Sequence, residues 1–149
     1  MARLRSGKAD LDVRTHDFSR LLPEFFSRHA GEFDVGFIRI AVPAGPLPIA
    51  VDARRLDRIL ANLLTIALNR ETGRARLDLQ VSVAEDKVHF TLTAHSEPSG
   101  AEPGLPSDDA PGLGALVARF LIERHGGELD VSRGSTNDLV LHFWLPTGN

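Results

Sequence analysis

Apolar residues recur along this chain at two spacings, one typical of helices and the other typical of strands. The helical spacing is clearest over residues 52–71, where apolar side chains form a wide stripe of the kind that packs on a sheet. Asp52 is a good N-cap for this helix, and Thr72 and Gly73 provide its end. The stripe consists of Leu56, Ile59, Leu60, Leu63, Leu64, Ala67 and Leu68.

The pattern predicts two further helices. Asp17 is a good N-cap for a helix that runs to about residue 33, and Pro23 should kink this helix or mark its beginning. The other helix covers residues 113–125, with His125 capping its last turn and Gly126-Gly127 supplying a left-handed exit. The expected buried face of this helix comprises Leu116, Val117, Phe120 and Leu121.

Alternation of apolar and polar residues predicts the strands. Single strands are expected over 37–42 and 49–51, and two hairpins over 75–83 with 88–94 and over 128–133 with 138–145. Residues 95–111 read as a long surface loop. This order of elements favours an α+β fold, a two-layer α/β sandwich with three helices on one face of a mixed, mostly antiparallel sheet.

Composition narrows the classes of function. A net charge of −3 over 149 residues gives no broad reason to expect a nucleic acid or an anionic membrane as partner. The chain has no cysteine, and its six histidines show no metal-binding spacing, so we expect no metal site. No apolar run reaches membrane-spanning length and no signal peptide is evident, so we expect a cytoplasmic location.

The glycines before the third helix offer the clearest candidate chemistry. Gly112 and Gly114 leave room for close approach to a helix N-terminus, where free N–H groups and the helix dipole favour a phosphate. The competing interpretation is a capped core helix with glycines at both ends, because short glycine motifs often match by chance.

Four stretches together resemble the ATP-binding domains of histidine kinases. They are residues 3–8, similar to the linker leaving the dimerisation helices; 52–64, similar to the N-box; 112–127, similar to the second glycine box; and 141–146, similar to the last strand. The resemblance implies a Bergerat-type ATP-binding fold over 16–149, preceded at 1–15 by a linker from a dimerisation region that this chain lacks. Since dimerisation in that family lies in those helices, we expect a monomer.

The chain departs from the family pattern at the positions where the family binds magnesium and adenine. Ile66 stands where the resemblance implies the asparagine that holds magnesium, and a hydrocarbon offers no oxygen to a hard cation. Ala94 stands in place of the aspartate that reads adenine, and Pro98 replaces a glycine. Asn69 lies nearby as a possible substitute ligand, the alternative being a helix-end cap. Glu97 and His95 are read as solvated loop residues rather than replacements.

The loop over 97–111 resembles a shortened ATP lid, but it carries Asp108 and Asp109 and no basic residue, and these acids would repel a triphosphate. His16 resembles a phosphoacceptor that opens a dimerisation helix, but the second long helix that should follow is missing, so we read it as a solvated residue before a helix cap.

These features lead to one main hypothesis and two alternatives. The main one is a degenerate ATP-binding-like domain of two-component signalling, with no catalytic residue and no cofactor. It would act on a response regulator or a histidine kinase by protein contact or in phosphotransfer. The first alternative is a divergent but active kinase domain, with Gly112 and Gly114 on the phosphates of ATP and Asn62 or Asn69 on magnesium. The second is an anti-sigma-type regulator, disfavoured because such proteins resemble working kinases at the sites lost here.

Overall fold

The computed structural model describes residues 11–31, 38–68, 76–95, 113–133 and 138–148. Along these residues the helices are α1 (Phe18–Arg28), α2 (Ala53–Leu68) and α3 (Leu113–Arg124). The strands are β1 (Arg14–Asp17), β2 (Ile38–Ala41), β3 (Pro48–Val51), β4 (Arg76–Ala84), β5 (Lys87–His95), β6 (Glu128–Arg133) and β7 (Leu139–Pro146).

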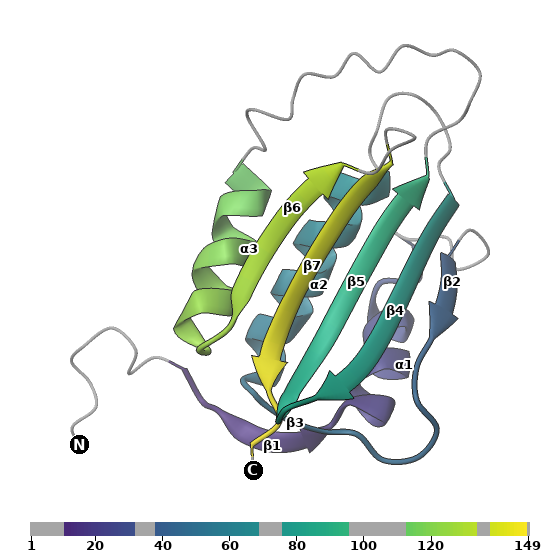
Figure 1. The fold of residues 1–149 in the computed structure, drawn as a ribbon. Coiled ribbons are helices and arrows are strands. Elements are labelled where there is room, and N and C mark those ends of the chain that lie inside the picture. The colour runs from purple at the N-terminus through teal and green to yellow at the C-terminus, as the bar shows by residue number, and fades with distance from the viewer. Residues whose placement is uncertain (1–10, 32–37, 69–75, 96–112, 134–137, 149) are drawn as a thin grey trace, which may run out of the picture.

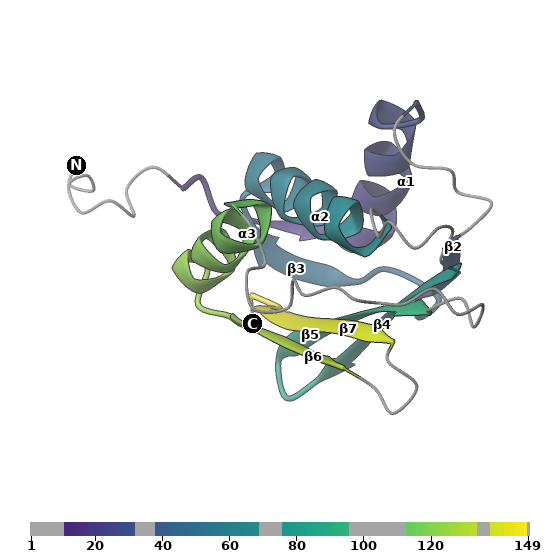
Figure 2. The same cartoon turned by 90° about the horizontal axis from the view of Figure 1, so that it is seen from above.

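Five strands form one mixed sheet in the order β2-β4-β5-β7-β6 (Figure 1). The pair β2 and β4 is parallel, and the other three pairs are antiparallel. Seen from above, the three helices lie on one side of this sheet (Figure 2). The predicted two-layer α+β sandwich, with three helices on a mixed and mostly antiparallel sheet, is therefore confirmed.

The strand β5 shows how the two faces of the sheet differ. Its alternate residues Val88, Phe90, Leu92 and Ala94 are buried against the helices, and the residues between them are half-buried on the opposite face. At the centre of the core, the ring of Phe90 stacks on Phe143 with centroids 4.4 Å apart and meets the edge of Phe18 at 5.2 Å. The sheet thus presents an apolar face to the helices and a polar face outward.

The helix α2 follows the pattern read from the sequence. The described members of its predicted stripe, from Leu56 to Ala67, are all buried. One carboxylate oxygen of Asp52 accepts hydrogen bonds from the backbone N–H of Arg54 at 3.1 Å and of Arg55 at 3.4 Å, which confirms the predicted N-cap. Since the apolar stripe and the cap agree, local signals alone locate this helix.

The N-terminal part of the chain departs from the predicted pattern. Arg14 and Thr15, predicted as part of a linker over 1–15, pair with β3 in a separate two-stranded antiparallel sheet. The helix α1 begins at Phe18 rather than near Pro23, and it ends at Arg28 rather than near residue 33. Asp17 is its N-cap as predicted, accepting from the N–H of Ser19 at 3.1 Å. Residues 1–10 lie outside the described residues.

The predicted buried face of α3 is wrong for two of its four members. Leu116 and Phe120 are each 56% exposed, whereas the buried residues of the helix are Ala115, Ala118 and Ile122. The physical reason is the position of α3 beside α2 and over the edge strand β6, which covers one side of the helix only. Small side chains on that covered side let the backbones of α2 and α3 approach closely.

Two tight turns match their residue types. Glu85 and Asp86 both have positive φ, 56° and 65°, as a two-residue hairpin turn between β4 and β5 requires. Gly126 has φ +94° and its N–H donates to the carbonyl of Glu123 at 3.0 Å, which confirms the left-handed exit predicted for α3.

Candidate functional site

Two of the four predicted ligand-binding residues lie against each other. The side-chain amide of Asn62, in α2, donates a hydrogen bond to the backbone carbonyl of Gly114 in the first turn of α3, at 3.2 Å. Gly112 and Asn69 lie outside the described residues, so their predicted roles stay predictions. The amide of Asn62 is therefore engaged in holding the start of α3 on α2, a contact that spacing along the sequence does not reveal.

The packing around Gly114 does not require a glycine. A Cβ added there would come no closer than 3.9 Å to a side-chain carbon of Asn62, which is ordinary van der Waals contact. Gly127 is the opposite case, because a Cβ there would lie 1.9 Å from the backbone oxygen of Trp144. Packing accounts for Gly127, but the described residues give no packing reason for the missing side chain at Gly114.

The structure describes two of the positions at which the chain departs from the family pattern, Ala94 and Ile66. Both have hydrocarbon side chains, one on the helix-facing side of the sheet and the other on α2. Ala94, at the end of β5, is 1% exposed and belongs to the core. Ile66 is half-buried in α2 and packs against the same core. Neither side chain carries an atom that binds a cation or accepts a hydrogen bond. Pro98 lies outside the described residues.

His95 is not placed to replace Ala94. It is the last residue of β5 rather than a loop residue, and its side chain lies on the outer face of the sheet, opposite to Ala94. There Nε2 of His95 lies 2.7 Å from a carboxylate oxygen of Asp78, and Nδ1 lies 3.2 Å from one of Asp138. His95 thus links β5 to β4 and to the residue before β7, and it faces away from the helix layer.

His125 connects the end of α3 to the start of α2. Its Nε2 accepts a hydrogen bond from the backbone N–H of Asp52 at 3.1 Å, so its Nδ1, 2.8 Å from the carbonyl oxygen of Leu121, carries the proton. The predicted capping role is confirmed, and the link to Asp52 is a tertiary contact that the sequence did not indicate. The other carboxylate oxygen of Asp52 accepts from the N–H of Asp12 at 2.8 Å.

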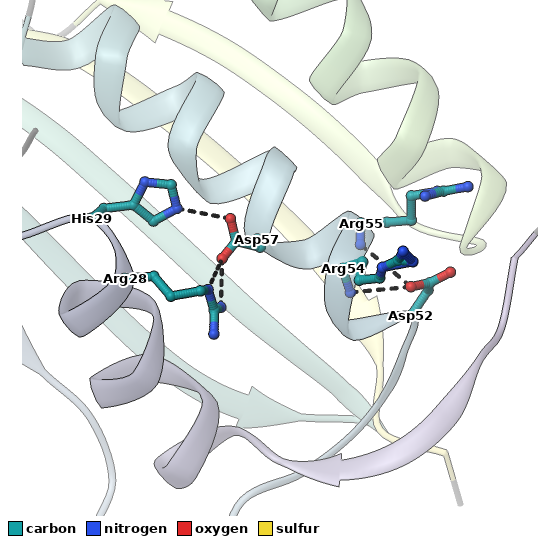
Figure 3. Close-up of polar contacts among 6 residues, drawn as sticks. All are labelled: Arg28, His29, Asp52, Arg54, Arg55 and Asp57. Atoms are coloured by element: carbon teal, nitrogen blue, oxygen red, sulfur yellow. Dashed lines mark hydrogen bonds and ion pairs between the residues drawn. The ribbon is translucent and has the colours of Figure 1, made fainter.

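A second polar contact joins α1 to α2. Figure 3 shows Arg28 and His29 at the end of α1 reaching the carboxylate of Asp57. The Nε of Arg28 lies 2.9 Å from one oxygen of Asp57, and Nε2 of His29 lies 2.8 Å from the other. Neither the positions of these three residues in the sequence nor their types predicted this contact, because it depends on how the two helices pack.

Hydrogen bonds lower the pKa of three aspartates. For Asp17, the bond from the backbone N–H of Leu47 is the largest cause, followed by the side-chain hydroxyl of Ser19. For Asp52, burial raises the pKa, but the N–H groups of its cap and of the N-terminal segment outweigh it. For Asp57, burial again raises the pKa, and the partners in α1 bring it below its usual value.

A histidine pair lies on the outer face of the sheet. The Nδ1 of His89 lies 3.1 Å from Nε2 of His142, and the ring centroids are 5.3 Å apart with planes 17° from parallel. One ring must donate and the other accept, so the pair cannot carry protons on both facing nitrogens. Burial lowers the pKa of His89, and the charges of His142 and Lys87 lower it further, with Glu85 opposing.

Acid is expected to destabilise the fold in two steps. Folding lowers the pKa of His89, so below about pH 6.5 the unfolded chain binds a proton that the folded chain does not, and stability begins to fall. The lowered pKa values of the three aspartates contribute stability that is complete above about pH 3.9 and is lost as the pH falls through their folded values. Urea-unfolding midpoints measured across this pH range test both steps.

Variants test whether the aspartates cause the loss of stability at the lower pH. Asp57→Asn should shrink the loss of stability below about pH 4, because the neutral amide no longer titrates. Asp130→Asn is the control, since Asp130 is exposed on β6 and forms no ion pair among the described residues. An acid limb of equal size in both variants would contradict the assignment.

The described residues include neither a metal-binding cluster nor a membrane-spanning helix. No three histidine, cysteine or acidic residues among them gather closely enough to hold a metal ion. None of the described helices is both long and apolar enough to cross a membrane.

No protein-family profile matches the sequence. FilI, a methanogenesis regulatory histidine kinase of Methanothrix harundinacea (strain 6Ac), is 23% identical over 142 residues, covering 87% of this chain but only 16% of FilI. The chain therefore corresponds to a small part of that protein.

Solved structures give a stronger likeness. The histidine kinase AdeS of Acinetobacter baumannii superposes with a TM-score of 0.71 at 17% identity, covering 93% of this chain and 69% of that one. The nucleotide-free catalytic domain of the histidine kinase ThkA also gives 0.71, at 19% identity, covering 92% of this chain and 98% of that domain. This chain has the fold of a histidine-kinase catalytic domain.

ThkA has also been solved with a partner. The structure of ThkA in complex with the response regulator protein TrrA matches with a TM-score of 0.68 at 18% identity, covering 91% of this chain and 42% of that one. The histidine-kinase resemblance read from four stretches of sequence is thus confirmed at the level of the fold. The residues that the sequence resemblance named for the candidate site and that the structure describes lie in α2, at the end of β5 and at the start of α3.

Proposed function

We propose that this chain is a two-component signalling domain that keeps the histidine-kinase catalytic fold, binds Mg-ATP weakly or not at all, and works through contact with another protein. The observation that carries the proposal is the pair Ile66 and Ala94. Both present hydrocarbon on the helix-facing side of the sheet, where the family resemblance implies an amide for magnesium and a carboxylate for adenine.

The size of the loss supports weak nucleotide binding. One missing charged hydrogen bond typically costs about 1.5–3 kcal/mol, or roughly ten- to a hundredfold in affinity. The NH2 group of Asn62 donates to the carbonyl of Gly114, which ties this side chain to the start of α3, and only its amide oxygen is left as a ligand for magnesium. The two defects affect base and cation separately, so their costs add approximately.

The proposed partner is a response regulator or a histidine kinase. ThkA, whose catalytic domain shares this fold, has been solved in complex with the response regulator TrrA. A domain that no longer holds nucleotide keeps its helices and sheet faces for such contacts. Within a longer protein, the domain would pass on a signal through these contacts rather than transfer a phosphoryl group itself.

Calorimetry with ATP and ADP, with and without magnesium, tests the proposal. We expect no micromolar binding to the natural chain. In Ile66→Asn with Ala94→Asp, both lost groups return, and we expect affinity for Mg-ATP to rise at least about tenfold. Ile66→Ala with Ala94→Ser is the matched control, and thermal melting shows which variants are folded. Micromolar affinity of the natural chain for Mg-ATP would refute the proposal.

One observation favours the alternative of a divergent, active kinase domain. Packing gives no reason for a glycine at position 114, and close approach of a phosphate would account for it. Under this alternative, Gly114→Val abolishes nucleotide binding while the chain stays folded. Under the main proposal, the same substitution changes no nucleotide signal, because there is none to lose.

A further inference from the structure

Two histidines face each other on the outer face of the sheet, away from the helices and from the candidate site. His89 lies on β5 and His142 on β7, which are neighbouring strands of the five-stranded sheet (Figure 1). Their facing nitrogens, Nδ1 of His89 and Nε2 of His142, are 3.1 Å apart, and we call these two residues the histidine pair. Spacing along the sequence did not indicate the pair, because the two positions are 53 residues apart and only the sheet brings them together.

The separation of the facing nitrogens fits two imidazole ligands of one metal ion. A nitrogen ligand lies about 2.0–2.1 Å from a zinc or similar ion, so two nitrogens 3.1 Å apart subtend an angle of about 100° at the ion. That angle lies between the right angle of square-planar coordination and the tetrahedral angle. The nitrogens therefore keep their separation when they share an ion, and each ring only turns until its lone pair points at the ion rather than at the other ring.

The backbone that carries the histidine pair is held on both sides. The strands β5 and β7 are inner strands of the sheet, and each pairs with a neighbour along both of its edges. His89 lies opposite Trp144, and His142 lies opposite Thr91, in one antiparallel register. Ligands on rigid strands lose little conformational freedom when they bind, so this placement favours binding of an ion.

The ring of His89 is in the protonation state that binds a metal. Burial lowers its pKa, and the charges of His142 and Lys87 lower it further, with Glu85 opposing, so the ring is neutral at pH 7. In the neutral pair, one facing nitrogen donates its proton to the other in a hydrogen bond. When an ion binds, that proton moves to the far nitrogen of the same ring, so both facing nitrogens offer lone pairs and no net proton is released.

The charges around the histidine pair suit a cation, with one exception. Asp130, on the edge strand β6, is the cross-strand partner of His142, and Glu128 is the cross-strand partner of Trp144. Both acids are exposed and form no ion pair among the described residues. Lys87 opposes a cation, but its ammonium group lies over the ring of Trp144, 4.4 Å from the ring centroid. Two acids therefore outweigh one lysine on this part of the face.

We propose that the histidine pair binds a divalent transition-metal ion of the class that prefers imidazole, such as Cu²⁺, Ni²⁺ or Zn²⁺, and thereby ties β5 to β7. Mg²⁺ prefers oxygen ligands and would not compete for this site. No third histidine, cysteine or acid among the described residues already lies close enough to share the ion, so water completes its coordination. With two protein ligands instead of the three or four of a built zinc site, we expect micromolar or weaker binding.

Calorimetry of the chain, made without a histidine tag, tests the inference with CuCl₂, NiCl₂, ZnCl₂ and MgCl₂. We expect one transition-metal ion for each chain, with Cu²⁺ bound more tightly than Ni²⁺ or Zn²⁺, as the general order of divalent-ion affinities predicts. MgCl₂ at the same concentrations should give no binding heat. In nuclear magnetic resonance spectra, Zn²⁺ should shift the resonances of Nδ1 of His89 and Nε2 of His142 together.

Variants locate the ion. His89→Gln and His142→Gln should each weaken Cu²⁺ binding at least about tenfold, because each removes one of the two imidazole ligands. His16→Gln is the matched control and should leave the affinity unchanged, since His16 lies on β1 in the separate two-stranded sheet. Thermal melting shows which variants are folded, and either single variant suffices if the other does not fold.

Four outcomes would overturn the inference. They are no Cu²⁺ binding tighter than about 1 mM, binding that both pair variants leave unchanged, equal binding of Mg²⁺, or sedimentation showing that the ion bridges two chains. The inference does not depend on the proposed function, because the histidine pair and the candidate site lie on opposite faces of the sheet. Mg-ATP binding would refute the proposed function alone, whereas failed Cu²⁺ binding would refute only this inference.

Discussion

Replacing Gly127 with alanine is expected to destabilise the domain by about 3 kcal/mol or more, or to prevent folding altogether. An added Cβ would lie 1.9 Å from the backbone oxygen and 3.0 Å from the backbone carbon of Trp144. That backbone cannot retreat cheaply, because Trp144 pairs with His89 of β5 on one side and with Glu128 of β6 on the other. Relief would require moving an inner strand of the sheet.

Urea denaturation at neutral pH measures this effect, with Gly114→Ala as the matched control. At Gly114, the added Cβ meets nothing closer than 3.9 Å, and alanine favours a helix over glycine by up to about 1 kcal/mol. The control should therefore be neutral or stabilising. If both variants lost equal stability, the close contact at Trp144 would not be the cause.

The second large effect is expected at Phe90. Its side chain is fully buried, stacked on Phe143 at 4.4 Å and edge-on to Phe18 at 5.2 Å. Phe90→Ala removes a ring that joins the sheet to α1, and it should cost about 3–5 kcal/mol through lost burial and the cavity left behind. The aromatic contacts account for about 0.5–1.5 kcal/mol of this for each pair.

The same substitution at an exposed ring is the control. Phe120 is 56% exposed on α3, so Phe120→Ala should change stability by no more than about 0.5 kcal/mol. Both variants are measured by urea denaturation. A large loss at Phe120 would mean that this ring is part of the core.

These results would describe a domain whose stability and function are separable. The parts that hold the fold are the central aromatic core, the close contact at Gly127 and the link between Asp52 and His125. Under the proposed function, such a domain keeps its fold after losing the groups that bind nucleotide.

The sequence by itself determined the local elements and, through four stretches in order, the fold. Spacing and residue type predicted several local features, because neighbours along the chain largely decide them. These features are the buried stripe of α2, the N-caps Asp17 and Asp52, and the two hairpins. The resemblance to histidine-kinase domains predicted the arrangement of these elements in the fold, since the order of motifs implies it.

Only the tertiary structure decided which side of an element meets which neighbour. Leu116 and Phe120 have the spacing of a buried face, yet α3 is covered on one side only and turns its small residues inward. His95 follows Ala94 in sequence but lies on the opposite face of the sheet, bonded to Asp78 and to Asp138. Periodicity identifies a face but not its partner, because that choice depends on residues far away in the chain whose contacts form only when the layers pack together.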